Sequence, residues 1–176
     1  MRISSSAIVL ILPCLFVGPV LGQGGTAGYG RGHRQASQDL VAALAGSWKL
    51  ELYHRGDSSP VLVGRRDMRL LQDSTKLLWT EVIRGRADTG SGVLGYNPTN
   101  RSYYVFGAYT HEADPIVLWG RADTSARSIT FEPASSDAVV VNRPGVFVSS
   151  QLRVIDANHF EWVATDGQWR AVFTRI

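Results

Sequence analysis

Apolar and polar residues alternate along most of the chain after residue 46, which is the pattern of half-buried β-strands. Trp48, Leu50 and Leu52 share one face of the first such stretch, and charged or amphipathic residues occupy the other. The same type of stretch recurs over residues 61–71, 76–84, 91–96, 102–109, 115–121, 128–131, 146–155, 159–165 and 168–176. Turn-forming sequences separate several of these stretches, among them residues 97–100, 156–158 and 166–167. The pattern therefore predicts about ten short strands.

Strands that follow one another without intervening helices favour an antiparallel meander, which commonly closes as a sandwich or as a barrel. Successive hairpins without long crossovers favour the barrel, because closure removes the exposed strand edges. We therefore expect an all-β domain over residues 37–176, a closed antiparallel up-and-down β-barrel. The longest connection, residues 134–145, is long enough to lie over one mouth of the barrel.

A short helix is expected before the first strand. Ser37 is a suitable cap for a helix over residues 38–45, in which Leu40, Val41 and Leu44 fall on one face. Two helical turns are not stable alone, so this face is expected to dock on the barrel and close one end of it. Residues 23–36 are rich in glycine and are expected to form a flexible leader.

The first 22 residues have the features of a secretory signal peptide. Arg2 lies near the start, residues 7–21 are apolar, and small or modest side chains precede Gln23. Cleavage before Gln23 would place the protein in the periplasm or the medium and would remove Cys14, the only cysteine. The alternative is an uncleaved N-terminal anchor, which the short apolar stretch disfavours. The mature form is thus expected to have no transmembrane segment and no disulfide.

Composition narrows the function without naming it. A net charge of +3 and a hydrophobic fraction of 44% fit one folded domain with its own core. The basic residues are scattered and do not form the clustered stripe of a nucleic-acid-binding protein, so no nucleic-acid partner is expected. The oligomeric state is left open.

The last strand predicts how the barrel closes. Trp169, Ala171, Phe173 and Arg175 share a face of this strand. Because the apolar face is expected to point into the barrel, Arg175 is expected to point inward as well. A buried guanidinium needs a partner, and an aromatic ring is a suitable one. Trp48, at the start of the first strand, is that ring if the first and last strands are neighbours.

These residues also carry a resemblance to a known family. The chain resembles the bacterial DUF1579 family, whose members are lipocalin-like barrels of the calycin superfamily. The matching motifs are L-x-G-x-W with its Gly46 at residues 44–48, G-x-x-x-L-G-Y-N at 90–97, an aromatic strand at 103–106, Leu-Trp-Gly at 118–120, Ile-Thr-Phe at 129–131, Val-Ile-Asp at 154–156, Asp-Gly-Gln-Trp at 166–169 and Phe-Thr-Arg at 173–175. The family has Tyr where this chain has Phe173. The resemblance implies the barrel fold over residues 40–176 and implies little about chemistry.

Charged residues at inward positions are the first candidates for a binding site. Arg66 shares its face with Leu62 and Met68, and Glu81 shares its face with Trp79. An inward Arg66 must pair with Glu81 as a structural ion pair or receive the acidic head of a ligand. His54 continues the inward face of the first strand and is placed at the rim of the barrel.

Large aromatic residues on central strands are the second group of candidates. A barrel of this size can hold one small ligand, lined by aromatic side chains with a few polar groups. Both faces of these strands carry apolar residues, so their inward face is ambiguous. The residues chosen are Trp79, Tyr104, Trp119 and Trp162.

The hypothesis that the protein is a hydrolase rests on one short motif. Asp88 begins an Asp-Thr-Gly sequence, the signature of aspartic proteases, and a related sequence begins at Asp123. The expected apolar residues before Asp88 are missing and the second copy lacks its glycine, so both are interpreted as hairpin ends. No two histidines have the spacing of a metal site, and none matches a haem ligand, so no metal or cofactor is expected.

The sequence therefore predicts an exported barrel that binds a small, mostly apolar or amphipathic molecule, without catalysis. Two alternatives remain. One is a filled barrel that serves as a structural or interaction domain, and the other is a hydrolase that uses Asp88. A ligand cavity of about 300 Å³ or more would favour binding over the filled barrel.

Overall fold

One helix and ten strands make up the part of the chain that the computed structural model describes, which is residues 27–73, 75–110, 115–123, 125–134 and 149–176. Helix α1 spans Ala27–Ala43. The strands are β1 Gly46–His54, β2 Leu62–Leu70, β3 Lys76–Ile83, β4 Thr89–Asn97, β5 Ser102–Tyr109, β6 Ile116–Asp123, β7 Ser128–Pro133, β8 Ser150–Val154, β9 His159–Ala164 and β10 Trp169–Arg175.

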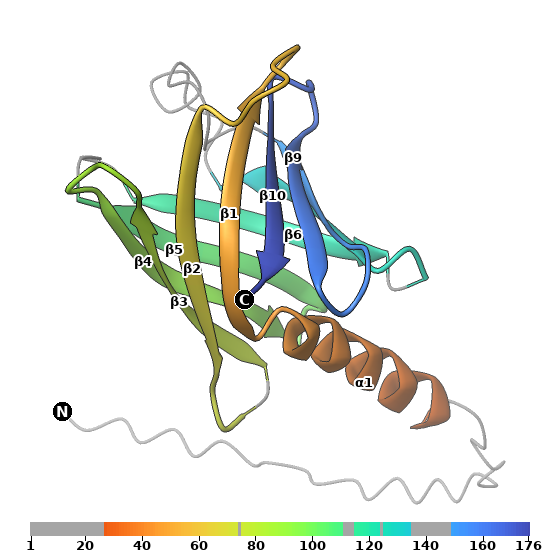
Figure 1. The fold of residues 1–176 in the computed structure, drawn as a ribbon. Helices are drawn as coiled ribbons and strands as arrows, with labels where there is room; N and C mark the ends of the chain where they lie inside the picture. The colour runs from red at the N-terminus through yellow and green to blue at the C-terminus, as the bar shows by residue number, and fades with distance from the viewer. Residues whose placement is uncertain (1–26, 74, 111–114, 124, 135–148) are drawn as a thin grey trace, which may run out of the picture.

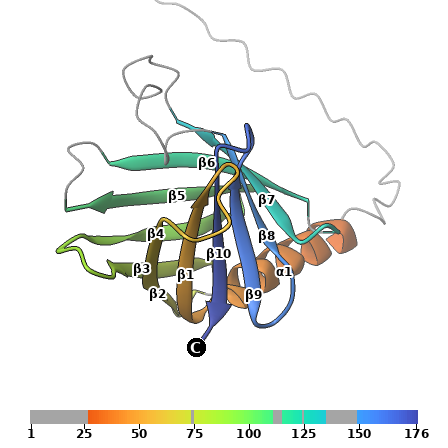
Figure 2. The same ribbon diagram turned by 45° about the horizontal axis from the view of Figure 1, so that its top comes forward.

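Every strand pairs antiparallel with its neighbours in the sequence, and β10 returns to pair with β1. The sheet is therefore a closed up-and-down barrel, and the sandwich alternative is wrong. Figure 2 shows that β1, β9 and β10 run up the view whereas β3, β4, β5 and β6 run across it, so the two halves of the barrel wall cross. This crossing follows from the right-handed twist of the strands and their tilt in a closed sheet.

The strand boundaries agree closely with the alternating pattern. The eighth strand begins at Ser150, within the range 146–155 expected for it, and residues 146–148 lie outside the described part of the chain. The connection expected to lie over a barrel mouth also falls outside the described residues, apart from Ala134.

The helix is longer than the sequence predicted. It begins at Ala27 rather than after Ser37, so residues 27–36 of the expected flexible leader are helical and Ser37 is an internal helical residue instead of a cap. The physical reason is that helix formation is limited by nucleation. The docked turns around Leu40, Val41 and Leu44, all three buried, supply that nucleus, and each residue added before them gains a hydrogen bond.

The predicted docking of the helix is present. Figure 1 shows α1 beneath the end of the barrel where β1 begins and β10 ends. The Trp48 indole Nε1 donates to the carbonyl of Leu44 at 2.9 Å, and the Tyr103 hydroxyl donates to the carbonyl of Ser37 at 3.4 Å. The helix therefore closes one end of the barrel, here called the helix end; the other is called the distal end.

Glycines in the wall make room for aromatic rings inside. The Trp79 ring occupies the space that a side chain would need at Gly92 of β4 and at Gly107 of β5. Phe131 does the same at Gly120. Trp79 thus packs against the barrel wall, where two neighbouring strands lack a Cβ, instead of projecting across the interior.

Candidate functional site

A buried ion pair lies in the interior of the barrel. Arg66 of β2 and Glu81 of β3 are opposite each other in the strand register. The Arg66 Nε donates to Glu81 Oε2 at 2.6 Å, and its Nη2 also contacts that oxygen. The two side chains are only 7% and 4% exposed, so each charge depends on the other for compensation. Of the two readings of inward Arg66, the partner Glu81 is therefore the one the structure shows.

Tyr109 of β5 completes this polar cluster. Its hydroxyl donates to Glu81 Oε1 at 3.1 Å and accepts a hydrogen bond from Arg66 Nη2 at 3.4 Å. Tyr109 was not among the predicted site residues, although it shares the inward face of β5 with Tyr103, Val105 and Gly107. Alternation gave no signal for it, because both faces of β5 carry apolar residues.

Three aromatic rings surround the guanidinium. The Arg66 Cζ lies 4.9 Å from the ring centroid of Trp79, 5.7 Å from that of Trp162 and 4.9 Å from that of Phe173. Cation–π attraction of this kind is strongest where water is excluded. Phe173 had been placed inward on β10 but was not recognised as a site residue. Trp79 and Trp162 were both predicted, and the structure brings them together here.

Burial and the neighbouring groups shift the pKa values of Arg66 and Tyr109. Burial alone would lower the pKa of Arg66, but Glu81 and Tyr109 outweigh it and leave the pKa above its ordinary value. Burial raises the pKa of Tyr109 well above that of a free tyrosine, and Arg66 opposes this only in part. Arg66 is therefore a guanidinium and Tyr109 a neutral phenol at neutral pH. Because the guanidinium forms an ion pair with Glu81, the charges of the cluster cancel.

The cluster lies below the distal end of the barrel. Inward-facing apolar residues near that end remain partly exposed, although they pack against the core. They are Leu52, Leu62, Tyr109, Trp162 and Trp169. The Trp169 indole Nε1 is buried and has no hydrogen-bond partner within the described part of the chain. Unlike the helix end, the distal end thus presents a rim of apolar and indole groups.

His54 and Gly46 lie where the sequence placed them, at opposite ends of β1. His54 is exposed and pairs with Trp169 at the distal rim. Gly46 has a φ of 137°, a region that favours glycine, and a Cβ there would collide with the Arg175 guanidinium. His54 has a rim position, and Gly46 has a structural role.

Tyr104 and Trp119, predicted as ligand-binding residues, do not face the interior. They are opposite each other on the outer face of β5 and β6, with ring centroids 6.1 Å apart, and Trp119 is 49% exposed. That prediction was wrong because both faces of these two strands are apolar. Alternation cannot then distinguish the inside from the outside.

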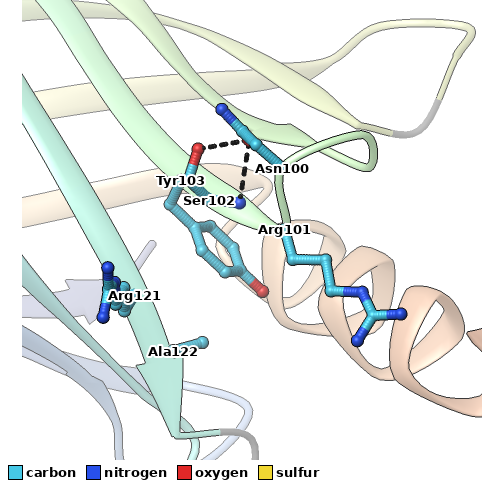
Figure 3. Close-up of a pocket in the computed structure, with 6 residues that line it drawn as sticks. All are labelled: Asn100, Arg101, Ser102, Tyr103, Arg121 and Ala122. Atoms are coloured by element: carbon cyan, nitrogen blue, oxygen red, sulfur yellow. Dashed lines mark hydrogen bonds between the residues drawn. The ribbon is translucent and has the colours of Figure 1, made fainter.

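A separate pocket of about 480 Å³ lies at the helix end (Figure 3). The ends of β5 and β6 form it, and its lining residues are Asn100, Arg101, Ser102, Tyr103, Arg121 and Ala122. The Asn100 side chain accepts hydrogen bonds from Ser102 N and Oγ, which shapes the turn before β5. None of the predicted ligand-binding residues lines this pocket.

The aspartates of the protease-like motifs have structural partners. Asp88 accepts a hydrogen bond from Thr110 Oγ1 at 2.9 Å. Asp123 accepts from the backbone N–H of Ser125 and Ala126 and from Ser125 Oγ, and these bonds lower its pKa. Such bonds are typical of Asx turns. Within the described residues, no group of three or more His, Cys, Asp or Glu side chains is placed to hold a metal ion.

Comparison with known proteins adds no family assignment. No family model matches the chain, and no curated protein matches it. In the described part of the chain no helix has the length and apolar character needed to cross a membrane. The features of the chain that bear on its function are therefore the barrel and the Arg66–Glu81–Tyr109 cluster inside it.

Proposed function

We propose that the barrel binds a small, mostly apolar molecule that enters at the distal end. The observation that supports this most is the position of the Arg66–Glu81–Tyr109 cluster. A polar group with fixed donors and acceptors lies among aromatic rings, below a rim of partly exposed apolar side chains. Binding sites for small molecules combine an apolar lining with a few polar groups that orient the ligand.

The charge of the cluster limits the ligand's polar group. An acidic head beside Arg66 would also meet the Glu81 carboxylate, because both are bound to the same Tyr109 hydroxyl. Displacing Glu81 from Arg66 would leave a buried carboxylate without compensation, which is costly. A hydroxyl or carbonyl group suits the neutral cluster better than a carboxylate does, which revises the acidic head expected from the sequence.

The competing proposal is a filled barrel with a structural or interaction role. It is favoured by the fact that Arg66 and Glu81 satisfy each other and that several of the largest inward side chains are fully buried. The two proposals differ in whether the interior accepts a molecule, which can be measured.

Tryptophan fluorescence provides that measurement, because Trp79 and Trp162 both lie beside Arg66. We expect 1-dodecanol to change the emission in a saturable way and dodecanoate to do so more weakly. Tyr109→Phe, which removes one hydroxyl from the cluster, is expected to weaken dodecanol binding severalfold. Tyr104→Phe removes the same group from the outer face and is the matched control.

A second measurement identifies a natural ligand. Native mass spectrometry of the purified protein is expected to show a bound small molecule that is lost on denaturation. No saturable change with either dodecyl probe, together with a mass spectrum of the bare chain, would favour the filled barrel.

We also propose that the protein is exported and that it is a calycin-type barrel related to the DUF1579 family. Export is supported by Arg2, the apolar stretch and the site before Gln23. N-terminal sequencing of protein from the periplasm or the medium is expected to begin near Gln23, and an intact Met1 there would contradict export. The relationship is supported by the motifs and by the closed barrel with Arg175 over Trp48.

A hydrolase that uses Asp88 is the least supported alternative, because the two motif aspartates serve turns and strand ends. Asp88→Asn is expected to leave the properties of the protein unchanged apart from a small loss of stability. Peptide hydrolysis by the wild type that this substitution abolishes would instead establish the enzyme.

A further inference from the structure

The outer face of the barrel is not uniform. On β1, β2, β8 and β9 it carries charged side chains that pair with one another, as in Arg65–Asp67 and Arg153–Glu161. On β3 to β6 the outer face is apolar over its middle and polar at positions such as Thr80, Ser91 and Arg121. Its largest apolar side chains are the exposed Phe106 and Trp119, at 53% and 49%. A contiguous exposed apolar patch on a folded domain commonly marks an interaction surface.

Strand register arranges this apolar patch in rows. Leu78 of β3, Val93 of β4, Phe106 of β5 and Val117 of β6 are successive register partners, so they form one row across four strands. The next row toward the helix end is Lys76, Gly95, Tyr104, Trp119 and Glu132, from β3 to β7. Figure 2 shows β3 to β6 side by side across the view. These two rows are called the β5 face here, because β5 contributes Phe106 to the first row and Tyr104 to the second.

The residues on one side of β5 in the β5 face are suited to contact those on the other side in a second copy of the chain. In the first row, Val93 and Val117 flank Phe106 at equal distances of one strand. In the second row, Lys76 and Glu132 lie two strands to either side of Tyr104. The Lys76 ammonium also pairs with Asp73 of its own chain, and the Glu132 carboxylate accepts a hydrogen bond from Ser149. A rotation by half a turn about an axis that runs along β5, above the sheet, exchanges Val93 with Val117 and Lys76 with Glu132.

We propose that a second copy of this chain docks on the β5 face through such a two-fold axis. Phe106 then packs on Phe106 of the second copy, and Val93 packs on Val117. Lys76 of each copy lies opposite Glu132 of the other, so the dimer has two equivalent ion pairs. Two-fold interfaces use the same surface patch on both subunits, and sheets that pack face to face keep their strands nearly aligned.

This arrangement leaves the interior of the barrel accessible. The β5 face lies on the outside of the wall, whereas the Arg66–Glu81–Tyr109 cluster lies inside it and below the distal end. The inference is therefore independent of the proposed ligand binding, and either can hold without the other.

Sedimentation equilibrium of the purified protein over a range of concentrations tests the proposal. The wild type is expected to show a reversible monomer–dimer equilibrium. Phe106→Lys places two ammonium groups against each other on the axis and is expected to weaken dimerisation by about tenfold or more. Ile155→Lys is the matched control, because Ile155 is 48% exposed on a different part of the surface.

Reversing the charges of Lys76 and Glu132 tests whether these two residues face each other across the proposed two-fold axis. Lys76→Glu and Glu132→Lys each place like charges across the interface, and each is expected to weaken the dimer by about threefold to tenfold. The double substitution restores opposite charges in both pairs, so it is expected to recover most of the lost affinity. Thermal melts of each variant show whether the monomer fold is kept.

Three outcomes would overturn the proposal. The first is a wild type that stays monomeric at every concentration. The second is a dimer that Phe106→Lys leaves intact, which would place the contact elsewhere on the surface. Equal dimer affinities of the single and double charge variants would likewise place the contact in another register. The third is a monomer whose binding to anionic phospholipid vesicles is lost in Phe106→Lys, which would assign the β5 face to a lipid surface instead.

Discussion

Arg175 lies over the indole ring of Trp48, with its Cζ 4.2 Å from the ring centroid, although 127 positions separate them in the chain. The two residues are register partners in the pairing of β1 with β10. The same guanidinium donates to the carbonyls of Ala45 and Ala157, at 2.9 Å and 2.8 Å. One side chain thus joins the last strand, the end of the helix segment and the turn before β9. This contact was predicted from the alternation that places both side chains inward and from the pairing of the first and last strands in a closed barrel.

A double-mutant cycle on this pair is expected to show coupling. Trp48→Ala removes a fully buried side chain and should cost about 3–5 kcal/mol of unfolding free energy. Arg175→Ala should cost about 1–2 kcal/mol through the lost cation–π contact, plus the loss of its hydrogen bonds. The sum of the two single losses should exceed the loss in the double variant, because either change removes the shared contact. Urea melts measure all four proteins, and strict additivity would contradict a direct contact.

Removing one charge of the buried ion pair is expected to destabilise the protein more than removing both charges. Glu81→Leu leaves Arg66 buried without its counter-charge and should cost about 3–5 kcal/mol. The double variant Arg66→Met with Glu81→Leu removes both charges and should regain most of that stability. The exposed pair Arg65 and Asp67 provides the control, since Asp67→Leu there should cost about 1 kcal/mol or less. Urea melts that show equal losses at both sites would argue against burial of the Arg66 pair.

Two glycine substitutions with opposite expected signs test the wall and the helix. Gly92→Ala forces a methyl group against the Trp79 ring and the Phe106 carbonyl, so it should destabilise the barrel by about 1–3 kcal/mol. Gly32→Ala lies in α1 with open space around it and should stabilise the protein by up to about 1 kcal/mol. Thermal melts give both signs. A destabilising Gly32→Ala would contradict a helix that begins at Ala27.

Alkaline pH is expected to destabilise the barrel through Tyr103. Burial raises the pKa of Tyr103 to about 12, whereas a free tyrosine titrates near 10. The folded state therefore prefers the neutral phenol, so its contribution is complete below about pH 10 and is lost between about pH 10 and 12. Urea melts at about pH 9 and about pH 11 should show a larger loss in the wild type than in Tyr103→Phe. Equal losses in both proteins would show that Tyr103 is not the group responsible.

The inward direction of a cluster residue could be predicted only on a strand whose other face is polar. On β2, the outward Arg65, Asp67 and Arg69 left Arg66 on the face of Met68, so its inward position followed from the sequence. On β5 and β6, Phe106 and Trp119 are as apolar as the residues on the inward side, and alternation gave no direction. Tyr104 and Trp119 were therefore misplaced, and Tyr109 was missed.

What the sequence determined by itself is the set of strands, their order as hairpins, and the closure that brings Trp48 to Arg175. These follow from local alternation and turn chemistry, which act between near neighbours in the chain. Only the tertiary structure decided which face of β5 points inward, how Tyr109 reaches Glu81, and how far the helix extends before Ser37. Each of these depends on free energy gained from distant partners, through burial against other strands or docking that nucleates a helix.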